Sequence, residues 1–448
     1  MCDVLLTDCR VVTENEDYLA NIAVQDGKIS AILAPEETLE AGQTISCAGK
    51  IVFPGMIDAH VHFNDPGYTH REEFASGTAA AAAGGLTAVV DMPLCNEPVA
   101  IGPAEVETKL EAVSKQAYVD FALWGGIVNN NFDKLKYMQS AGVAAVKGFL
   151  VSQGEEFPWL STGVLYEGMA KCAELDLMIG LHCEDEALVG HRTSIAKRKG
   201  DLSVEDFLWC HAPETEIVSV NTAIEIARAT GVKLHILHVS LPEAIEKVVQ
   251  AKSEGVNVTV ETCPHYLVLD EDDLREKGAY AKCTPPIRSR DKVEGLWQCL
   301  LDGKIDYLGS DHSPSTIEEK EQASFGKSWG GIQGVQYMLP IMLSEGVHKR
   351  GMSLNQLAGL LSVNPSKRMG FYPRKGTVRV GAEASFTVVD LDKPWEIDRE
   401  GIRFKNKHTP YLGMKGKGAP VMTILRGNVV YDGRDVVHQD GRYLNMSR

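Results

Sequence analysis

The chain has 448 residues, and its 45 Lys and Arg against 61 Asp and Glu give a formal net charge of −16. That charge excludes a protein that binds nucleic acid or another polyanion over its whole surface. Apolar residues make up 44% and charged residues 24%, which is typical of folded globular proteins rather than disordered chains. A chain of this length accommodates one large domain and one smaller one.

The sequence contains no signal for a membrane or for export. No stretch approaches the roughly 18 consecutive apolar residues of a membrane span, and no long apolar run follows a basic region near the first residue. The ten cysteines are scattered without a C-x-x-C pair, which argues against a disulfide scaffold and against a structural zinc ribbon. We therefore expect a cytoplasmic protein with no membrane partner.

Short alternating strands are predicted near both ends of the chain. The pattern covers residues 4–6, 11–12, 22–29, 384–390 and 423–431. The dipeptide Asp26-Gly27 is a strong hairpin turn signal within the first group. Because the two groups have the same character, we expect them to form one small, discontinuous β domain.

The middle of the chain alternates apolar strand-like runs with stretches of helical periodicity. The predicted strands are 55–63, 86–92, 118–124, 143–149, 178–183, 233–239, 257–262 and 305–310. The stretches between them include 78–83, 104–113, 163–175, 215–229, 242–253 and 291–301. Eight such units predict an α/β fold, a (β/α)₈ TIM-like barrel. A doubly wound open sheet is the alternative, but the chain has neither a G-x-G-x-x-G after the first strand nor a Walker A motif.

Chemically active side chains follow the predicted strands of this barrel. In such barrels the active site lies at the carboxyl ends of the strands. Those ends carry His60, His62, Lys147, His182, His238 and Asp311. Four imidazoles, one amine and one carboxylate are thus expected at one face of one barrel.

The histidines favour a metal site. One residue separates His60 from His62, so both rings point to the same side of a strand, about 6–7 Å apart. Hydrogen-bonded structural histidines are the alternative, but His182 and His238 favour the metal, because imidazole is the commonest metal ligand. We expect His235 to point to the opposite face of its strand and to be structural.

Lys147 and Asp311 each allow two interpretations. A neutral lysine amine can react with carbon dioxide to give an anionic carbamate that bridges two ions, whereas an ordinary lysine in an ion pair is the simpler interpretation. Asp311 can ligate a metal and accept a proton from water, or it can be a turn or helix-capping aspartate. Spacing alone favours the ordinary lysine at Lys147 and leaves the question open at Asp311.

Seven segments resemble, in order, the motifs of the cyclic amidohydrolases. They are V-F-P-G-M-I-D-A-H-V-H (52–62), V-K-G-F (146–149), L-H-C-E (181–184), L-H-V-S (237–240), T-C-P-H-Y (262–266), T-P-P-I-R (284–288) and G-S-D-H-S-P (309–314). The stretch G-T-V-R-V-G-A from Gly376 resembles the return into that family's β-sandwich. The resemblance implies a β-sandwich domain of residues 1–53 plus 376–448 and a metal-dependent hydrolase barrel of residues 54–375.

The resemblance also implies a site. Two divalent ions, usually zinc, are implied, with carbamylated Lys147 bridging them. One ion is expected on His60, His62 and Asp311. The other is expected on His182 and His238, and a ring amide is hydrolysed while Asp311 passes a proton to the leaving nitrogen. Relatives are commonly homotetramers.

Four further positions indicate the branch of the family. Dihydroorotases typically have an arginine where this chain has Asn64, and hydantoinases usually have a tyrosine where it has Ser152. Allantoinases are more similar, and Thr284 and Gly330 are suited to binding a ureide ring. We expect hydrolysis of the small molecule allantoin to allantoate, a step of purine breakdown. Hydantoinase or dihydropyrimidinase activity is the neighbouring alternative, and a non-catalytic scaffold without metal ligands is the alternative from another class.

Overall fold

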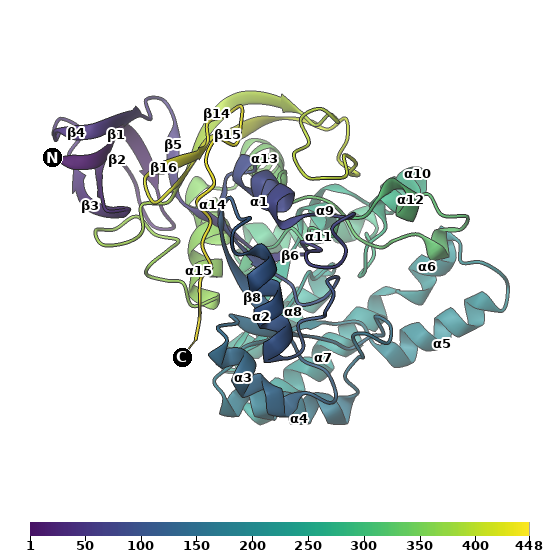
Figure 1. Ribbon diagram of the computed structural model, residues 1–448. Helices are drawn as coiled ribbons and strands as arrows, with labels where there is room; N and C mark the ends of the chain where they lie inside the picture. Colours follow the sequence, from purple (N-terminus) through teal and green to yellow (C-terminus); the bar gives the residue numbers. More distant parts are fainter. Residues whose placement is uncertain (448) are drawn as a thin grey trace.

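The computed structural model describes residues 1–447 and contains two eight-stranded sheets. The last residue of the expected 376–448 segment lies outside the described residues. In Figure 1 the helices surround one sheet, and the second sheet lies at one edge, where the purple N-terminal strands meet yellow-green C-terminal strands. The expected fold class, an α/β barrel with a smaller, discontinuous β domain, is confirmed.

The first sheet is the barrel. Its strands are β6 (Met56–Val61), β7 (Leu86–Asp91), β8 (Asp120–Gly126), β9 (Ala145–Phe149), β10 (Ile179–His182), β11 (Leu234–Ile236), β12 (Val258–Thr262) and β13 (Tyr307–Leu308). They pair in chain order, and every pair is parallel. A bridge between Val61 and His312 brings the segment after β13 against β6. All eight predicted strands are present; β8 is shifted by two residues from its apolar run, and each of the others is shorter than its run.

Helices cover the outside of the barrel, so most barrel strands are buried on both faces. The helices are α1 (Phe74–Ala83), α2 (Pro103–Val113), α3 (Leu135–Ser140), α4 (Thr162–Glu174), α5 (Glu186–Lys197), α6 (Val204–Cys210), α7 (Pro213–Thr230), α8 (Pro242–Ser253), α9 (Pro264–Val268), α10 (Glu271–Lys277), α11 (Arg290–Leu301), α12 (Ile317–Lys320), α13 (Met338–Ile341), α14 (Leu354–Ala358) and α15 (Asn364–Arg368). None of those in residues 1–447 combines the length and apolar character that a membrane span requires.

The second sheet joins the two ends of the chain. Its strands are β1 (Cys2–Val12), β2 (Asp17–Gln25), β3 (Lys28–Leu33), β4 (Ala41–Ser46), β5 (Ile51–Pro54), β14 (Phe386–Glu396), β15 (Lys415–Leu425) and β16 (Asn428–Tyr431). The hairpin predicted at Asp26-Gly27 connects β2 to β3, and the antiparallel pair β5–β14 connects the two groups. Beyond β16 the tail turns back to the barrel, where Tyr443 bridges Phe121 of β8. The domain boundaries at 53/54 and 375/376 stay a prediction.

Candidate metal centre and active site

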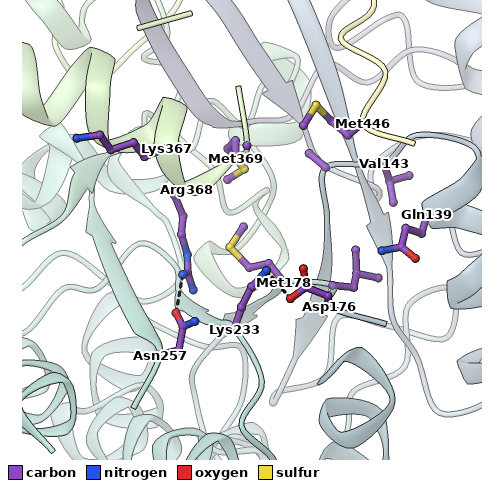
Figure 2. A pocket seen from close by; sticks show the side chains of 13 residues that line it. Gln139, Val143, Asp176, Met178, Lys233, Asn257, Lys367, Arg368, Met369 and Met446 are labelled. Carbon is purple, nitrogen blue, oxygen red and sulfur yellow. Dashed lines mark hydrogen bonds and ion pairs between the residues drawn. The ribbon is translucent and has the colours of Figure 1, made fainter. Parts of the chain in front are cut away.

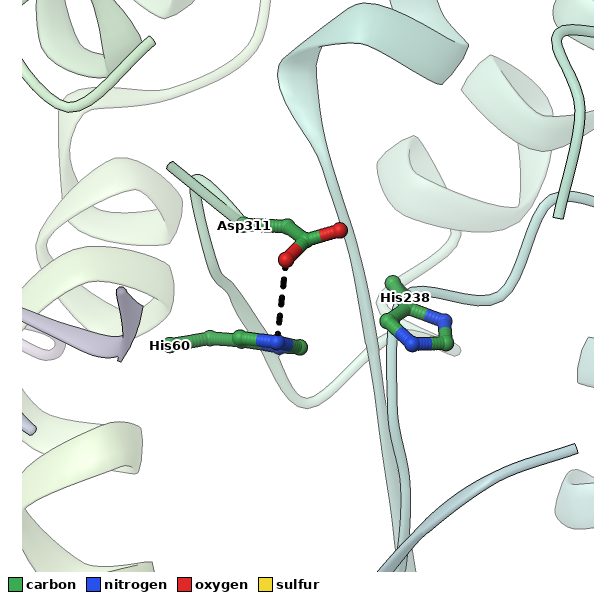
Figure 3. A group of neighbouring side chains, drawn as sticks. All are labelled: His60, His238 and Asp311. Atoms are coloured by element: carbon green, nitrogen blue, oxygen red, sulfur yellow. Dashed lines mark ion pairs between the residues drawn. The ribbon is translucent and has the colours of Figure 1, made fainter. Parts of the chain in front are cut away.

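His60, His62 and Asp311 form one cluster at the carboxyl ends of the barrel strands. The Nε2 atoms of His60 and His62 lie 3.1 and 3.2 Å from the same Asp311 oxygen, Oδ1. Figure 3 shows the Asp311 carboxylate above the His60 ring, with the His238 ring facing both. One donor atom each from His60, His238 and Asp311 falls within 4.8 Å of the others.

A second cluster lies beside the first. Nδ1 of His182 and Nε2 of His238 face each other at 3.0 Å, and the His60 and His238 ring centroids are 5.3 Å apart. Lys147 is 1% exposed and places its amine 4.6 Å from the centre of the Phe149 ring. No described residue forms an ion pair or hydrogen bond with that amine. The structure thus brings together all six side chains expected at the metal centre.

The donors fit a divalent metal ion. Buried imidazole nitrogens normally have a hydrogen-bond partner, but Nδ1 of His62 and Nδ1 of His238 have none among the described residues. Burial raises the pKa of the Asp311 carboxyl, but the neighbouring His60 and His62 rings hold it well below its usual value. Imidazole nitrogens and an ionised carboxylate are ligands that zinc takes in proteins.

Two glutamates that sequence reasoning missed hold the histidines in place. Glu261 accepts from Nδ1 of His60 at 2.5 Å, and Glu184 lies 2.8 Å from Nε2 of His182. Such partners fix the ring orientation and tautomer of metal-binding histidines. Burial raises the pKa of Glu261, but His60 and His235 bring it down to about 2. Glu184 follows His182 by two residues, a spacing that could have indicated it, whereas nothing in the sequence pairs Glu261 with His60.

The orientation predicted for His235 is wrong. Its Nε2 lies 3.2 Å from Glu261, the carboxylate that also holds His60, so the ring points toward the site and not away from it. The reason is that β11 ends at Ile236 and His238 adopts a φ of 39°, which breaks the alternation of a regular strand. Asp311 also has a positive φ, 45°. Non-glycine residues in this region are uncommon, and they cluster at functional sites.

The metal cluster opens into a cavity of 610 Å³. Ser152, Thr284 and Gly330, three of the four expected substrate contacts, line it. Asn64 does not line it: its side-chain amide donates to the carbonyl of Cys95 at 2.9 Å, and Cys95 is the residue that faces the cavity. The substrate roles of these four residues stay predictions.

A smaller cavity of 170 Å³ lies at the opposite, amino-terminal end of the strands. Figure 2 shows the Asp176–Lys233 ion pair, 2.5 Å long, and the Arg368–Asn257 hydrogen bond among methionine side chains. Its described lining has no histidine. The carboxyl-terminal cavity is therefore the candidate active site, as expected for a (β/α)₈ barrel.

The comparisons with known proteins agree with this geometry. Residues 51–430 match the model of the amidohydrolase family. A curated allantoinase of Salmonella paratyphi B is 37% identical over 435 residues, which cover 96% of this chain and 95% of the relative. An allantoinase of Salmonella choleraesuis has the same identity and coverage. The chain therefore belongs to the amidohydrolase family.

Solved structures support the same class. The L-hydantoinase (dihydropyrimidinase) from Arthrobacter aurescens has a TM-score of 0.96 and 34% identity, with 99% of both chains covered. A dihydropyrimidinase from Brevibacillus agri has a TM-score of 0.92 and 28% identity, with 98% of both chains covered. The expected enzyme class, a cyclic amide hydrolase of the amidohydrolase family, is confirmed.

Proposed function

We propose that this protein hydrolyses the cyclic amide bond of allantoin to give allantoate, as a step of purine breakdown. The observation that carries the proposal is the lining of the 610 Å³ cavity, which joins the metal cluster to small polar groups at Ser152, Thr284 and Gly330. The described lining contains neither arginine nor tyrosine. A carboxylate substrate such as dihydroorotate would therefore lack a guanidinium partner. The 37% identity to curated allantoinases supports the same substrate.

The metal ligands follow from the two clusters. His60, His62 and Asp311 would hold one divalent ion, and His182 and His238 the other, with zinc the expected metal. When bound, such ions polarise a carbonyl and lower the pKa of water. Burial lowers the pKa of Lys147 to about 8, against the opposing effect of Asp311 and Glu261. A lower pKa raises the fraction of neutral amine, which adds carbon dioxide and loses a proton to form the bridging carbamate.

Asp311 is the proposed proton carrier. Its carboxylate is ionised, lies at the floor of the cavity and contacts both His60 and His62. It would accept the proton of the attacking water and deliver it to the ring nitrogen as the amide bond breaks. Ser152, Thr284 and the Gly330 backbone would orient the ureide ring by hydrogen bonds.

A substrate panel tests the proposal. Allantoin, dihydroorotate, dihydrouracil and hydantoin would be assayed at identical metal loading. We expect kcat/KM to be much higher for allantoin than for any of the other three. The second candidate, a hydantoinase or dihydropyrimidinase, is favoured by the TM-score of 0.96 to an L-hydantoinase. Faster hydrolysis of dihydrouracil or hydantoin than of allantoin would select that second candidate.

We further propose that the enzyme is a cytoplasmic homotetramer. The support is the resemblance to a family whose members are commonly tetramers, together with the absence of a membrane-spanning helix among residues 1–447. Light scattering after size-exclusion chromatography measures the assembly directly. A stable monomer would contradict the tetramer and leave the active-site proposal unchanged.

A further inference from the structure

Two buried lysines hold the segment that forms one side of the active-site cavity. This segment runs from α12 through a short 3₁₀ turn (Phe325–Lys327) to Gly331, and Trp329, Gly330 and Gly331 line the cavity. Lys282 is 7% exposed and Lys320 is 2% exposed. Lysine is almost never fully buried unless it is paired, so the partners of both ammonium groups need an explanation.

Lys320 is bound by backbone carbonyls. Its Nζ donates to the carbonyls of Gly331, Ala279 and Trp329 at 2.6, 2.9 and 3.1 Å. An ammonium group has three N–H donors, so these carbonyls use its whole capacity. No carboxylate of the described residues forms an ion pair with it. The lysine therefore ties the loop on both sides of Gly330 to the segment that contains Ala279.

Lys282 holds the preceding part of the same loop. Its Nζ donates to the carbonyls of Ser328 and Phe325 at 2.7 and 2.8 Å and approaches that of Gly326 at 3.4 Å. It also lies over the Phe325 ring, 4.9 Å from the centroid. The backbone of Lys282 accepts from the N–H of Gly331 at 2.8 Å. One residue thus contacts the loop at both of its ends.

The anchoring leaves the backbone unit of one residue, Gly330, without partners. The carbonyls of Trp329 and Gly331 are bound by Lys320, whereas neither the N–H nor the carbonyl of Gly330 has a hydrogen-bond partner in residues 1–447. A Cβ at Gly330 would meet open space, so this unit faces the cavity without obstruction. Backbone donors and acceptors placed in this way fix the orientation of small polar ligands.

We propose that Lys282 and Lys320 are positioning residues that hold the backbone N–H and carbonyl of Gly330 as hydrogen-bonding groups for the cyclic amide substrate. This inference rests on the proposed function for the identity of the ligand. A ureide or imide ring presents alternating N–H and carbonyl groups, which match the one donor and the one acceptor that the backbone of Gly330 offers. Lys320 does not line the cavity, and Lys282 lines it but directs its Nζ to the loop carbonyls, so both act through the loop.

Proton loss from either lysine weakens the anchor. Burial lowers the pKa of Lys320 to about 7 and that of Lys282 to about 8. The other titratable groups around Lys320 are Lys282 and Cys283 on one segment, Glu319 on α12, and His408 across the loop. A neutral amine has two N–H groups and a lone pair, so one carbonyl loses its donor. KM should therefore rise as the pH increases from 7 to 9.

Lys320→Met tests the proposal, with Lys327→Met as the matched control. Lys327 lies in the same loop, but its side chain is 64% exposed and its ion pair with Asp201 is long, at 4.0 Å. Loss of the anchor should raise KM for the best cyclic amide about tenfold, the effect of roughly one to two hydrogen bonds, with kcat within about threefold of wild type. Between pH 7 and 9 the KM of the variant should also rise less than that of the wild type, because only Lys282 is left to lose its proton, whereas Lys327→Met should keep wild-type values throughout.

Hydrogen exchange provides a readout that does not depend on activity. In the metal-loaded wild type, the amides of residues 325–331 should exchange faster at pH 9 than at pH 6.5 after correction for intrinsic rates. In Lys320→Met they should exchange fast at both pH values. If that variant does not fold, Lys282→Met should show the same effect over residues 325–328.

Unchanged KM and unchanged protection in a folded variant would overturn the inference. A wild type inactive on every ring of the panel would overturn the proposed function, while the exchange result would still test the anchor.

Discussion

The carboxyl and amino ends of the barrel strands differ in whether their polar side chains have hydrogen-bond or ion-pair partners. At the carboxyl ends, ring nitrogens of His62 and His238 are buried without hydrogen-bond partners among the described residues, and Asp311 and His238 have positive φ angles. At the amino ends, Lys233 is paired with Asp176 at 2.5 Å, and Arg368 donates to the carbonyl of Leu234. One end therefore keeps groups available for a ligand at a cost in stability, and the other uses its charges to link the chain.

The largest effect should come from the proton carrier at the carboxyl end. Asp311→Asn keeps the size of the side chain but removes its basicity, so kcat should fall about 10³- to 10⁴-fold. The far-ultraviolet circular dichroism spectrum should stay that of the wild type. Turnover within tenfold of wild type would show that another group moves the proton.

Loss of the bridging side chain should have the next largest effect. Lys147→Ala removes the proposed carbamate, so activity should fall at least about 10²-fold and bound metal should decrease. Because the alanine leaves space for a small carboxylate, added acetate or propionate should restore part of the activity. Full metal content with normal turnover would contradict the bridge.

A smaller effect is expected from the residue that orients His60. Glu261→Gln weakens the hydrogen bond of this side chain to Nδ1 of His60 and also changes its contact with Nε2 of His235. Metal affinity should fall about 10- to 100-fold, measured by competition with a chelator. Glu184→Gln provides the matched test at His182. An unchanged affinity in both variants would mean that these carboxylates serve only the fold.

The smallest effect should come from the amino-terminal end. Lys233 and Asp176 have side chains that are 34% and 65% exposed, so water screens their attraction. Lys233→Met should lower the free energy of unfolding by about 0.2–1 kcal/mol and leave kcat/KM unchanged. Urea unfolding and a standard assay measure the two quantities. A large loss of activity would mean that both ends of the strands serve catalysis.

Most of the fold could be predicted from the sequence, because apolar runs and helical periodicity report burial directly. The limits of the strands could not, since an apolar run continues into buried loops: residues 233–239 are apolar enough for a strand, but β11 covers only Leu234–Ile236. Because the strand ends there, the alternation that would place His235 and His238 on opposite faces does not extend to His238. A positive φ at a histidine has no signature in a single sequence.

In the candidate site, too, some features could be predicted from the sequence and others could not. That the six side chains expected at the metal centre lie close together could be predicted, because strand ends meet at one face of a barrel; their roles as ligands stay a prediction. Glu261, Lys282 and Lys320 could not, because charged residues are usually exposed and their partners are backbone carbonyls or a histidine far away in the sequence. The position of Asn64 in a motif predicts a substrate contact, yet its side chain contacts the Cys95 carbonyl and does not line the cavity.

The central claim is that the carboxyl ends of the strands hold a dinuclear metal centre. The most direct test is the metal content per chain of the purified protein, measured by elemental mass spectrometry alongside Lys147→Ala. We predict two divalent ions per chain in the wild type and fewer than two in the variant. A fully active wild-type protein with no bound metal would contradict the claim.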